Sequence, residues 1–408
     1  MKDIEMARRI AEKVADKGGR TYYVGGCVRD ALLHMEIKDV DIEVHGIEVR
    51  ALEEILDGLG ERIAIGASFG VFGLRHYGLD IAMPRMEKAT GRRHKDFAVF
   101  VDPFIGAQKA ARRRDFTINA MMQDVLTGEV LDFYGGREDL ERGILRHVND
   151  QSFAEDALRV LRAAQFAARF GFAVAEETVR LCSAMDLSAL APERVQAETD
   201  KALLKADAPS VYFETLKAMR QTGTWFPEIH ALSSEAYAKT MHTLDRAAAL
   251  SESAEYKEGF MVAALFLECE SFDTNTLCPE VRRAKYVKNM VPLATRPDAL
   301  VAQSADKVEF MRLFDACVSP EDLLLLARAS RERDSRDVER HLEDMLEQYH
   351  LLKDTRQVMG ADLVGRGFAP SPLFSRALSF AHDLWLRGAP YAEALRETVS
   401  FMERGGES

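Results

Sequence analysis

YYVGGCVRDALLHMEIKDVDIEV (residues 22–44) combines a glycine turn with two closely spaced aspartates, and the rest of the chain is interpreted from it. Its first three residues favour a β-strand, Gly25 and Gly26 end that strand, and residues 27–34 are typical of the first turns of a helix. Glycines let a backbone pass close to a ligand, and the N–H groups at a helix start attract anions. Arg29, one turn into the helix, can add a charge-assisted contact to the same phosphates. The stretch therefore predicts a phosphate-binding strand, turn and helix.

The second half of the stretch predicts a metal site. Alternation along a strand places Asp39 and Asp41 on one face, and two carboxylates so close repel each other. Divalent cations relieve that repulsion, and Mg²⁺ is usually held by one or two carboxylates together with substrate phosphates. Two such ions can clamp the attacking and leaving oxygens of a phosphoryl displacement. Asp80, in an expected strand at residues 79–83, is a candidate third ligand; a solvated edge strand is the alternative for the aspartate pair.

Composition bounds the class of protein. The chain has 408 residues, 47% of them hydrophobic, which is enough for two or more domains with their own cores. No apolar run approaches the roughly 20 residues that cross a bilayer, and the charged N-terminal helix lacks a signal-peptide core, so we expect a cytoplasmic protein. Its five cysteines show no CxxC spacing and predict neither a zinc site nor disulfides. A net charge of −12 argues against nonspecific coating of nucleic acid, although local basic clusters remain.

Two later segments extend the predicted site. Residues 86–104 are polar and glycine-bearing, which indicates a mobile loop leading into a strand at residues 97–101. Residues 112–120, RRRDFTINA, then bring Arg114, Asp115 and Asn119 together at a helix start. Arginines suit a triphosphate, and Asp or Asn side chains suit the hydroxyls of a ribose.

A base-reading pair is predicted in the helix expected at residues 153–172. Asp156 and Arg159 lie three residues apart on one helix face, an acceptor beside a donor. Asp can accept from the exocyclic amine of cytosine or adenine, and Arg can donate to the adjacent ring nitrogen. Uracil and guanine present mismatched edges, so the pair favours C and A. For Asp156 and Arg159, a surface i,i+3 ion pair is the simpler alternative.

Six ordered motifs, GGCVRD, DVD, RRRDFTINA, DFYGGREDLERGILR, EDALRVLRAAQFAARFGF and PERVQAETDKALL, together resemble the class II tRNA nucleotidyltransferase and bacterial poly(A) polymerase family. The resemblance implies an α+β fold, with a polymerase-beta-type head of mixed sheet and helices at residues 1–147. An all-helical neck (148–206), body (207–340) and tail (341–408) would follow, with the tail holding the tRNA.

The resemblance also implies an activity, in which CTP and ATP are added to a tRNA 3′ end without a template. Its Mg²⁺ ligands would be Asp39 and Asp41, as catalytic residues, with Asp80. Its nucleotide-binding residues would be Gly25, Gly26, Arg29, Arg114, Asp115, Asn119, Asp156, Arg159 and Arg162. In the resemblance, Arg162 and residues 193–201 would also support the helix that recognises the base. We favour full CCA addition because the loop at residues 86–104 is present; CC addition, A addition and poly(A) tailing are the alternatives within the family.

Two other classes of function stay open. Long bacterial relatives carry a metal-dependent phosphohydrolase domain, and His242-Thr243 resembles its first ligand segment. The chain has AALFLE at residues 263–268 where a His-Asp pair would follow, so we expect no phosphohydrolase activity and a purely helical scaffold there. This degenerate region suggests an RNA-binding scaffold without catalysis, whereas the GG and DxD motifs also occur in small-molecule nucleotidyltransferases. The intact head motifs argue against a scaffold without catalysis. The long helical half argues against a small-molecule nucleotidyltransferase.

Overall fold

The computed structural model describes residues 2–37, 39–66, 70–89, 97–273, 275, 277–278 and 280–405. The chain divides into two compact units, residues 1–202 with 211–225, and residues 203–210 with 226–408. Within the described ranges, no helix combines the length and apolar composition needed to cross a membrane.

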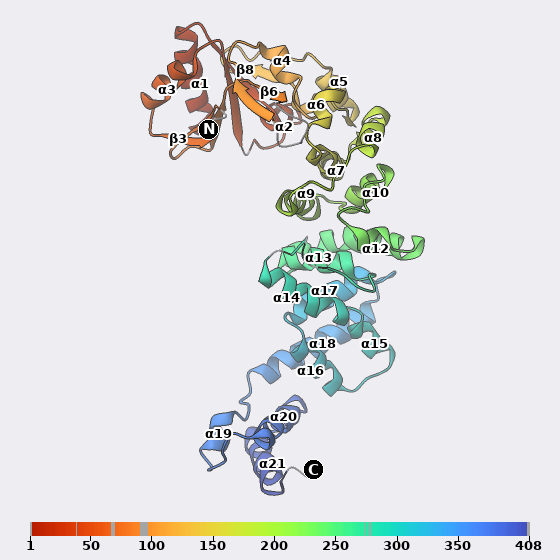
Figure 1. Cartoon of the computed structure of the whole chain (residues 1–408). Helices are drawn as coiled ribbons and strands as arrows, with labels where there is room; N and C mark the ends of the chain where they lie inside the picture. Colours follow the sequence, from red (N-terminus) through yellow and green to blue (C-terminus); the bar gives the residue numbers. More distant parts are fainter. Residues whose placement is uncertain are drawn as a thin grey trace. The chain divides into compact units, whose positions relative to one another are not determined.

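The first unit is built on a seven-stranded mixed sheet in the order β3-β4-β5-β2-β1-β8-β9 (Figure 1). Strand β2 pairs in parallel with β5, and the other neighbouring pairs are antiparallel. The sheet strands are β1 (Arg20–Val24), β2 (Val40–His45), β3 (Arg62–Gly66), β4 (Val71–Leu74), β5 (Leu79–Ala82), β8 (Met122–Asp124) and β9 (Val130–Leu131). Separate pairs are formed by β6 (Arg85–Ala89) with β7 (Phe97–Val101), and by β10 (Ile144–Leu145) with β11 (Ala173–Val174).

Helices cover both faces of this sheet. Helices α1 (Lys2–Asp16) and α3 (Val49–Asp57) pack on one face, where Val40, Ile42 and Val44 of β2 enter their shared core (Figure 1). Helix α4 (Ala107–Ala111) packs on the other face with Tyr22 and Val24 of β1. Because side chains alternate along a strand, the polar residues of β2 point away from the α1 and α3 core. This alternation directs them toward the side of the sheet that α4 covers.

Most of the expected elements of the head are confirmed. The strand, glycine turn and helix are β1, Gly25 and α2 (Gly26–Leu32), and the strand expected at residues 79–83 is β5. The expectation that Asp39 lies within a strand is wrong, because β2 begins at Val40 and Asp39 occupies the preceding bend. The loop expected at residues 86–104 is wrong in part, since residues 86–89 pair with β7; residues 90–96 lie outside the described residues.

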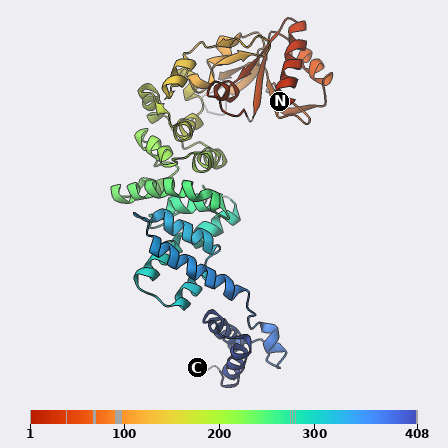
Figure 2. The same cartoon turned by 180° about the vertical axis from the view of Figure 1, so that it is seen from behind.

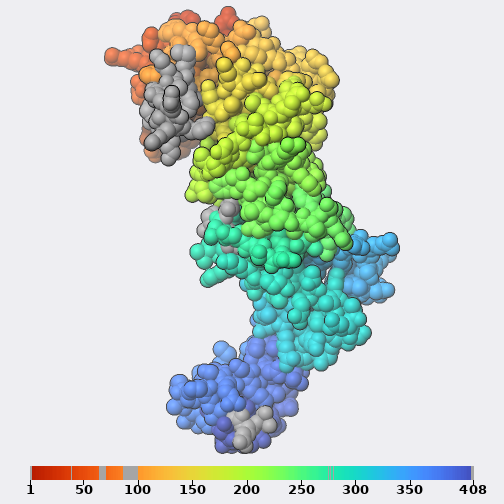
Figure 3. Space-filling model, turned by 45° about the vertical axis from the view of Figure 1, so that its right-hand side comes forward, coloured from red at the N-terminus to blue at the C-terminus, as the bar shows by residue number. Residues whose placement is uncertain are grey.

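Helices continue from the sheet to the end of the first unit. Figure 3 shows the residues of α5 to α7 forming one continuous surface with the head. These elements are η2 (Thr117–Asn119), α5 (Gly136–Arg142), α6 (Asp150–Ala154), α7 (Leu158–Phe170), α8 (Glu176–Ser183), α9 (Pro192–Lys205) and α10 (Ser210–Ala218). The single helix expected at residues 153–172 is wrong, because residues 155–157 interrupt it between α6 and α7.

Every helix or strand in the described part of the second unit is a helix (Figure 2). Its elements are α11 (Pro227–His230), α12 (Ser234–Leu250), η3 (Ser251–Ser253), α13 (Lys257–Phe266), α14 (Val281–Met290), η4 (Val291–Leu293), α15 (Arg296–Ala302), α16 (Lys307–Ala316), α17 (Pro320–Ser330), α18 (Arg336–Lys353), α19 (Gly360–Val364), α20 (Pro372–Leu386) and α21 (Tyr391–Glu403). Helices α19 to α21 enclose a hydrophobic cluster of their own, which includes Phe374, Ala377 and Phe401. His242 is exposed on α12, whereas Ala263, Ala264 and Leu265 are buried in α13.

Candidate active site

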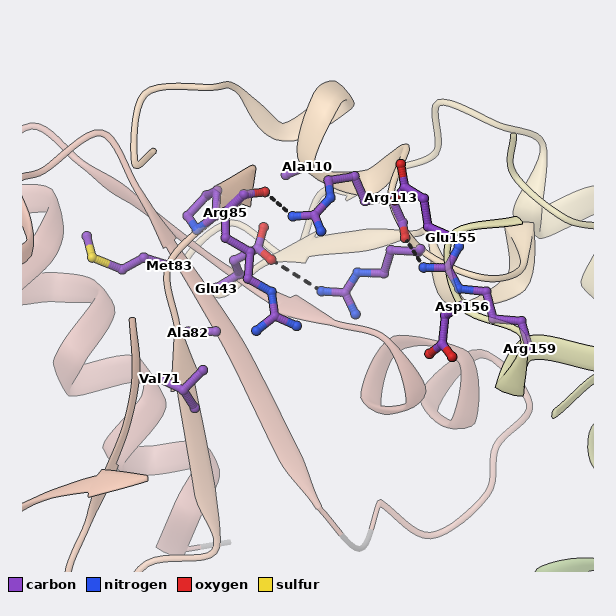
Figure 4. A pocket seen from close by; sticks show the side chains of 12 residues that line it. Glu43, Val71, Ala82, Met83, Arg85, Ala110, Arg113, Glu155, Asp156 and Arg159 are labelled. Carbon is purple, nitrogen blue, oxygen red and sulfur yellow. Dashed lines mark hydrogen bonds and ion pairs between the residues drawn. The ribbon is translucent and has the colours of Figure 1, made fainter. Parts of the chain in front are cut away.

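A cavity of about 350 Å³ lies in the first unit, between the sheet and the segment that leads into α7 (Figure 4). In Figure 4, Glu43 and Arg85 lie on one side of it, and Asp156 and Arg159 on the other. The sheet, α4 and the break between α6 and α7 all contribute residues to the lining of the cavity. The cavity is lined by Glu43, Val71, Ala82, Met83, Pro84, Arg85, Ala110, Arg113, Arg114, Glu155, Asp156 and Arg159.

Beside this cavity, two of the predicted metal ligands are adjacent on neighbouring strands. Asp41 on β2 and Asp80 on β5 are directly paired in the parallel register, so both side chains project from the same face of the sheet. Asp41 is half-buried, while Asp80 and Asp39 are exposed. Burial raises the pKa of Asp41, the nearby charges of Asp80 and Asp39 raise it further, and Arg114 opposes the rise. The three carboxylates therefore repel each other, which favours a cation among them.

The carboxylates of Asp39, Asp41 and Asp80 can supply only part of the coordination shell of a metal ion. Among the described residues, no group of three or more His, Cys, Asp or Glu side chains is arranged to hold a metal by itself. Mg²⁺ usually takes only one or two protein carboxylates and completes its shell with water and substrate phosphates. Asp41 and Asp80, with Asp39 before β2, fit an ion that shares its coordination with a substrate in this way.

Arg114 lies over the glycine turn. Gly25 has φ +68°, and a Cβ built there would lie 2.9 Å from Nη1 of Arg114 and 3.9 Å from Oδ2 of Asp41. The turn needs glycine both for its left-handed backbone and for the space that the guanidinium occupies. Nη2 of Arg114 also donates to Oε2 of Glu43 at 3.4 Å. The predicted phosphate ligands Gly25 and Arg114 are thus brought together next to a predicted metal ligand.

The predicted base-reading pair also lies in the cavity, in a conformation that the sequence did not predict. Asp156 precedes α7, and its Oδ1 accepts from the N–H of Leu158 at 3.1 Å while its Oδ2 accepts from Nη2 of Arg194 at 2.9 Å. Arg159 donates to the carbonyl oxygens of Ser152 at 2.6 Å and Arg113 at 2.7 Å. The carboxylate and the guanidinium are therefore held in place by the backbone and by Arg194.

Four other predicted nucleotide ligands are connected in one buried polar network, defined here as Arg29, Asn119, Asp115, Arg162 and Glu198. Nη1 of Arg29 donates to Oδ1 of Asn119 at 2.7 Å, and Nδ2 of Asn119 donates to Oδ1 of Asp115 at 3.0 Å. Arg162 pairs with Asp115 at 2.7 Å and with Glu198 at 3.8 Å. The network connects α2 and η2 of the head with α7 and α9 and does not contribute to the cavity lining given above.

Arg29 is enclosed more completely than a phosphate ligand at a helix start was expected to be. It is 5% exposed, bonds to Asp30 at 2.6 Å, and its guanidinium lies 4.7 Å from the ring centroid of Phe170. Gly26 packs against it, because a Cβ there would lie 3.3 Å from Nη2 of Arg29. The guanidinium therefore joins the glycine turn to α7.

Glu43 and His45 are site residues that the sequence analysis missed. Both lie on β2 at the alternating positions that follow Asp41, and Nε2 of His45 bonds to Oε1 of Glu43 at 2.8 Å. Burial, the largest effect, raises the pKa of Glu43, but the hydrogen bonds and charges of His45 and Arg114 outweigh it and hold the pKa below its ordinary value. The signal was available, since DVDIEVH continues the same alternation for two more polar residues.

With this geometry established, the chain was compared with known proteins. Residues 21–146 match the poly A polymerase head domain family. The resemblance found in the sequence is thereby confirmed, and head domains of this family belong to metal-dependent nucleotidyltransferases.

Among curated proteins, the chain is 40% identical over 228 residues to the multifunctional CCA protein of Haemophilus ducreyi, covering 54% of each chain. It is 42% identical over 220 residues to the protein of the same name from Stenotrophomonas maltophilia, covering 52% of each. The matched part thus spans about half of the length of these relatives.

Solved structures extend the likeness of the fold to the whole chain. The Thermotoga maritima CCA-adding enzyme complexed with tRNA matches 98% of this chain and 95% of its own, with a TM-score of 0.71 and 21% identity. The Bacillus stearothermophilus CCA-adding enzyme in complex with CTP matches 99% and 98%, with a TM-score of 0.71 and 23% identity. The predicted fold class, a polymerase-beta-type head followed by helices, is confirmed.

Proposed function

We propose that the chain adds CCA to the 3′ end of tRNA, transferring CMP and AMP from CTP and ATP and releasing pyrophosphate without a template. The observation that carries this proposal is the convergence in one cavity of Arg114 with the base-reading pair Asp156 and Arg159, beside Asp41 and Asp80. The names and bound ligands of the similar proteins support it.

The base would be selected by Asp156 and Arg159. An ionised carboxylate only accepts hydrogen bonds and a guanidinium only donates them, so the pair complements cytosine and adenine and opposes uracil and guanine. Both side chains are already fixed by Leu158, Ser152 and Arg113, which lowers the entropy lost when a base binds. Each retains hydrogen-bonding capacity for the base.

The triphosphate would be held by Arg114 and by the turn at Gly25 and Gly26. Mg²⁺ is the ion we propose for Asp39, Asp41 and Asp80, where it would neutralise charge on the phosphate oxygens. We propose that the buried polar network, four of whose members were predicted nucleotide ligands, acts by fixing the glycine turn and α7 in position. Its side-chain hydrogen bonds within the protein support that role.

Poly(A) tailing is the second candidate, because the matching family model describes a poly A polymerase head domain and the same pair accepts adenine. Full CCA addition, CC addition and A addition differ in how the loop at residues 86–104 acts, and part of that loop lies outside the described residues. We retain head (1–147), neck (148–206), body (207–340) and tail (341–408) as proposed functional boundaries, a cytoplasmic location, and a body without phosphohydrolase activity.

The test is incorporation of labelled CTP and ATP, separately and together, into tRNA transcripts that end at the discriminator base, at C, and at CC, with an unrelated RNA as control. One CCA end followed by a stop is expected. Addition of A alone to the CC-ended transcript would identify an A-adding enzyme, addition that stops at CC a CC-adding enzyme, and long A tails on every RNA a poly(A) polymerase. Incorporation into none of them would contradict the proposal and support a scaffold.

A further inference from the structure

The cavity contains a buried carboxylate with no assigned role. Glu43 is 8% exposed and lies in the middle of β2, where an isolated carboxylate charge would be costly. One oxygen binds His45 and the other binds Arg114, so both carboxylate oxygens have a partner. Those two partners compensate the burial of its charge.

His45 holds the carboxylate oxygen of Glu43 that does not contact Arg114. It is 7% exposed, and its ring packs edge-on against Tyr22 at 5.3 Å between centroids. Its Nε2 atom lies 2.8 Å from Oε1 of Glu43, and because an ionised carboxylate only accepts hydrogen bonds, Nε2 is the donor. His45 therefore holds one carboxylate oxygen of Glu43, and the other oxygen faces Arg114.

Arg114 is oriented by a carboxylate of the sheet, whereas Arg113 donates to the carbonyl of Arg85 and Arg159 donates to the carbonyls of Ser152 and Arg113. For Arg114, the side-chain partner is Glu43, and that contact uses Nη2 while Nη1 lies over Gly25. A guanidinium has five N–H donors, so Arg114 can keep Glu43 and still offer donors above the glycine turn.

We propose that Glu43, anchored by His45, is a positioning residue that holds Arg114 over the glycine turn for the triphosphate of the incoming nucleotide. This inference rests on the proposed function. Glu43 contacts no phosphate itself, because like charges repel; it sets the orientation of the cation that does. An arginine fixed in advance loses less side-chain entropy on binding, so the benefit appears in nucleotide affinity.

The test compares Glu43→Gln with Glu53→Gln. Glutamine keeps the shape of Glu43 and removes its charge, and Glu53 is a matched control because its carboxylate pairs with Arg62 at 2.8 Å in the same head, away from the cavity. We expect E43Q to raise KM for both CTP and ATP about tenfold, as loss of a charge-assisted hydrogen bond does, with kcat within about twofold of the wild type. E53Q should leave both constants unchanged, and thermal melting checks that both variants fold.

A double-mutant cycle with Arg114→Ala separates positioning from packing. If Glu43 acts through Arg114, adding E43Q to R114A raises KM no further; an additional increase of equal size would overturn the inference. A fall in kcat with unchanged KM and a higher Mg²⁺ requirement would also overturn it, since that result would make Glu43 a metal ligand.

Equilibrium titration with CTP and Mg²⁺ needs neither tRNA nor turnover. E43Q is expected to weaken CTP binding about tenfold. An unchanged Kd would overturn the proposed role of Glu43 without affecting the proposed function of the chain. Failure of the proposed function would show instead as a wild-type protein that incorporates nothing into tRNA.

Discussion

Asp115 is a buried carboxylate whose charge is retained. Burial, the largest effect, raises its pKa, but Arg162, Asn119 and the N–H of Phe116 together hold the pKa below its ordinary value. Arg162 is itself mostly enclosed and also faces Glu198. Removing one partner of such a pair leaves the other charge buried and uncompensated, so this position is more sensitive than an exposed ion pair.

We therefore expect Asp115→Asn to lower the free energy of unfolding by about 3 kcal/mol at neutral pH. A lowered folded-state pKa contributes stability above the unfolded value, about 3.9, that is lost as pH falls through the folded-state pKa. The difference between wild type and variant should therefore shrink at acidic pH. Urea unfolding at pH 7 and below pH 4 measures it, with Asp57→Asn, in an exposed pair with Arg62, as the control. An equal loss for both variants would contradict the expectation.

The pKa of Asp41 is shifted in the opposite direction to that of Asp115. Burial and then Asp80 and Asp39 raise its folded-state pKa, so its ionised form destabilises the metal-free protein at neutral pH. Stability contributed by the bound proton is present below the unfolded pKa and is lost as pH rises through the folded one.

Asp41→Asn should accordingly melt at a higher temperature than the wild type without metal. Mg²⁺ should raise the melting temperature of the wild type and leave that of the variant unchanged, because ligand binding to the folded state is stabilising. Incorporation should fall about a thousandfold, the effect of losing several kcal/mol of metal-assisted catalysis. Melting curves with and without Mg²⁺, together with the incorporation assay, test this. A variant that keeps normal incorporation would remove Asp41 from the metal site.

At the scale of elements, the break between α6 and α7 prepares the base-reading pair. Asn149 caps α6 by accepting from Ser152, and Asp156 accepts from Leu158 at the start of α7. Residues 155–157 belong to neither helix and turn the chain there. Asp156 therefore reaches the cavity from the start of α7. In the continuous helix that the apolar spacing predicted, Asp156 would instead lie within the helix, one turn after its start.

The break makes a selective change possible. In Asp156→Asn, the amide can still accept from Leu158 but can also donate, which suits the carbonyl oxygen of uracil. We expect use of UTP relative to CTP to rise by about tenfold, within the 1–3 kcal/mol that one base contact discriminates. Competition between labelled UTP and CTP on tRNA measures the ratio. Asp150→Asn, in the first turn of α6, is the control, and unchanged selectivity in D156N would exclude the carboxylate from base choice.

At the scale of the whole molecule, the head and the tail have separate cores. The cluster of α19 to α21 is apolar, whereas polar contacts join α20 to α16, including His382 with Asp315 at 2.8 Å and Arg312 with Asp383. A part with its own core and polar connections can be removed with limited damage to the remainder. The nucleotide cavity should therefore work without it.

Removing residues 355–408 should leave KM for CTP unchanged and raise KM for tRNA about tenfold or more, since it deletes most of the proposed tRNA-holding tail. Steady-state kinetics with each substrate varied in turn distinguish the two. A chain with both constants unchanged would show that the tail does not hold tRNA.

How far the sequence predicts this protein depends on the distance over which its determinants act. The strand, glycine turn and helix at residues 20–32 and the alternation of β2 follow from local stereochemistry, which is why they were predictable. The start of β2 after Asp39 and the α6–α7 break were not, because a bend and a side-chain cap compete with regular structure over only one or two residues.

The sequence by itself determined the types of chemistry present: a glycine turn, a DxD pair, and an Asp and an Arg three residues apart. Only the tertiary structure decided how they are used. It joined β2 with β5 so that Asp41 faces Asp80, enclosed Arg29 and Asp115 in the buried polar network, and brought Glu43 to Arg114 across 71 residues. Contacts between residues so far apart arise from packing of the sheet against α4 and of α2 and the segment before η2 against α7, and no local pattern encodes that packing.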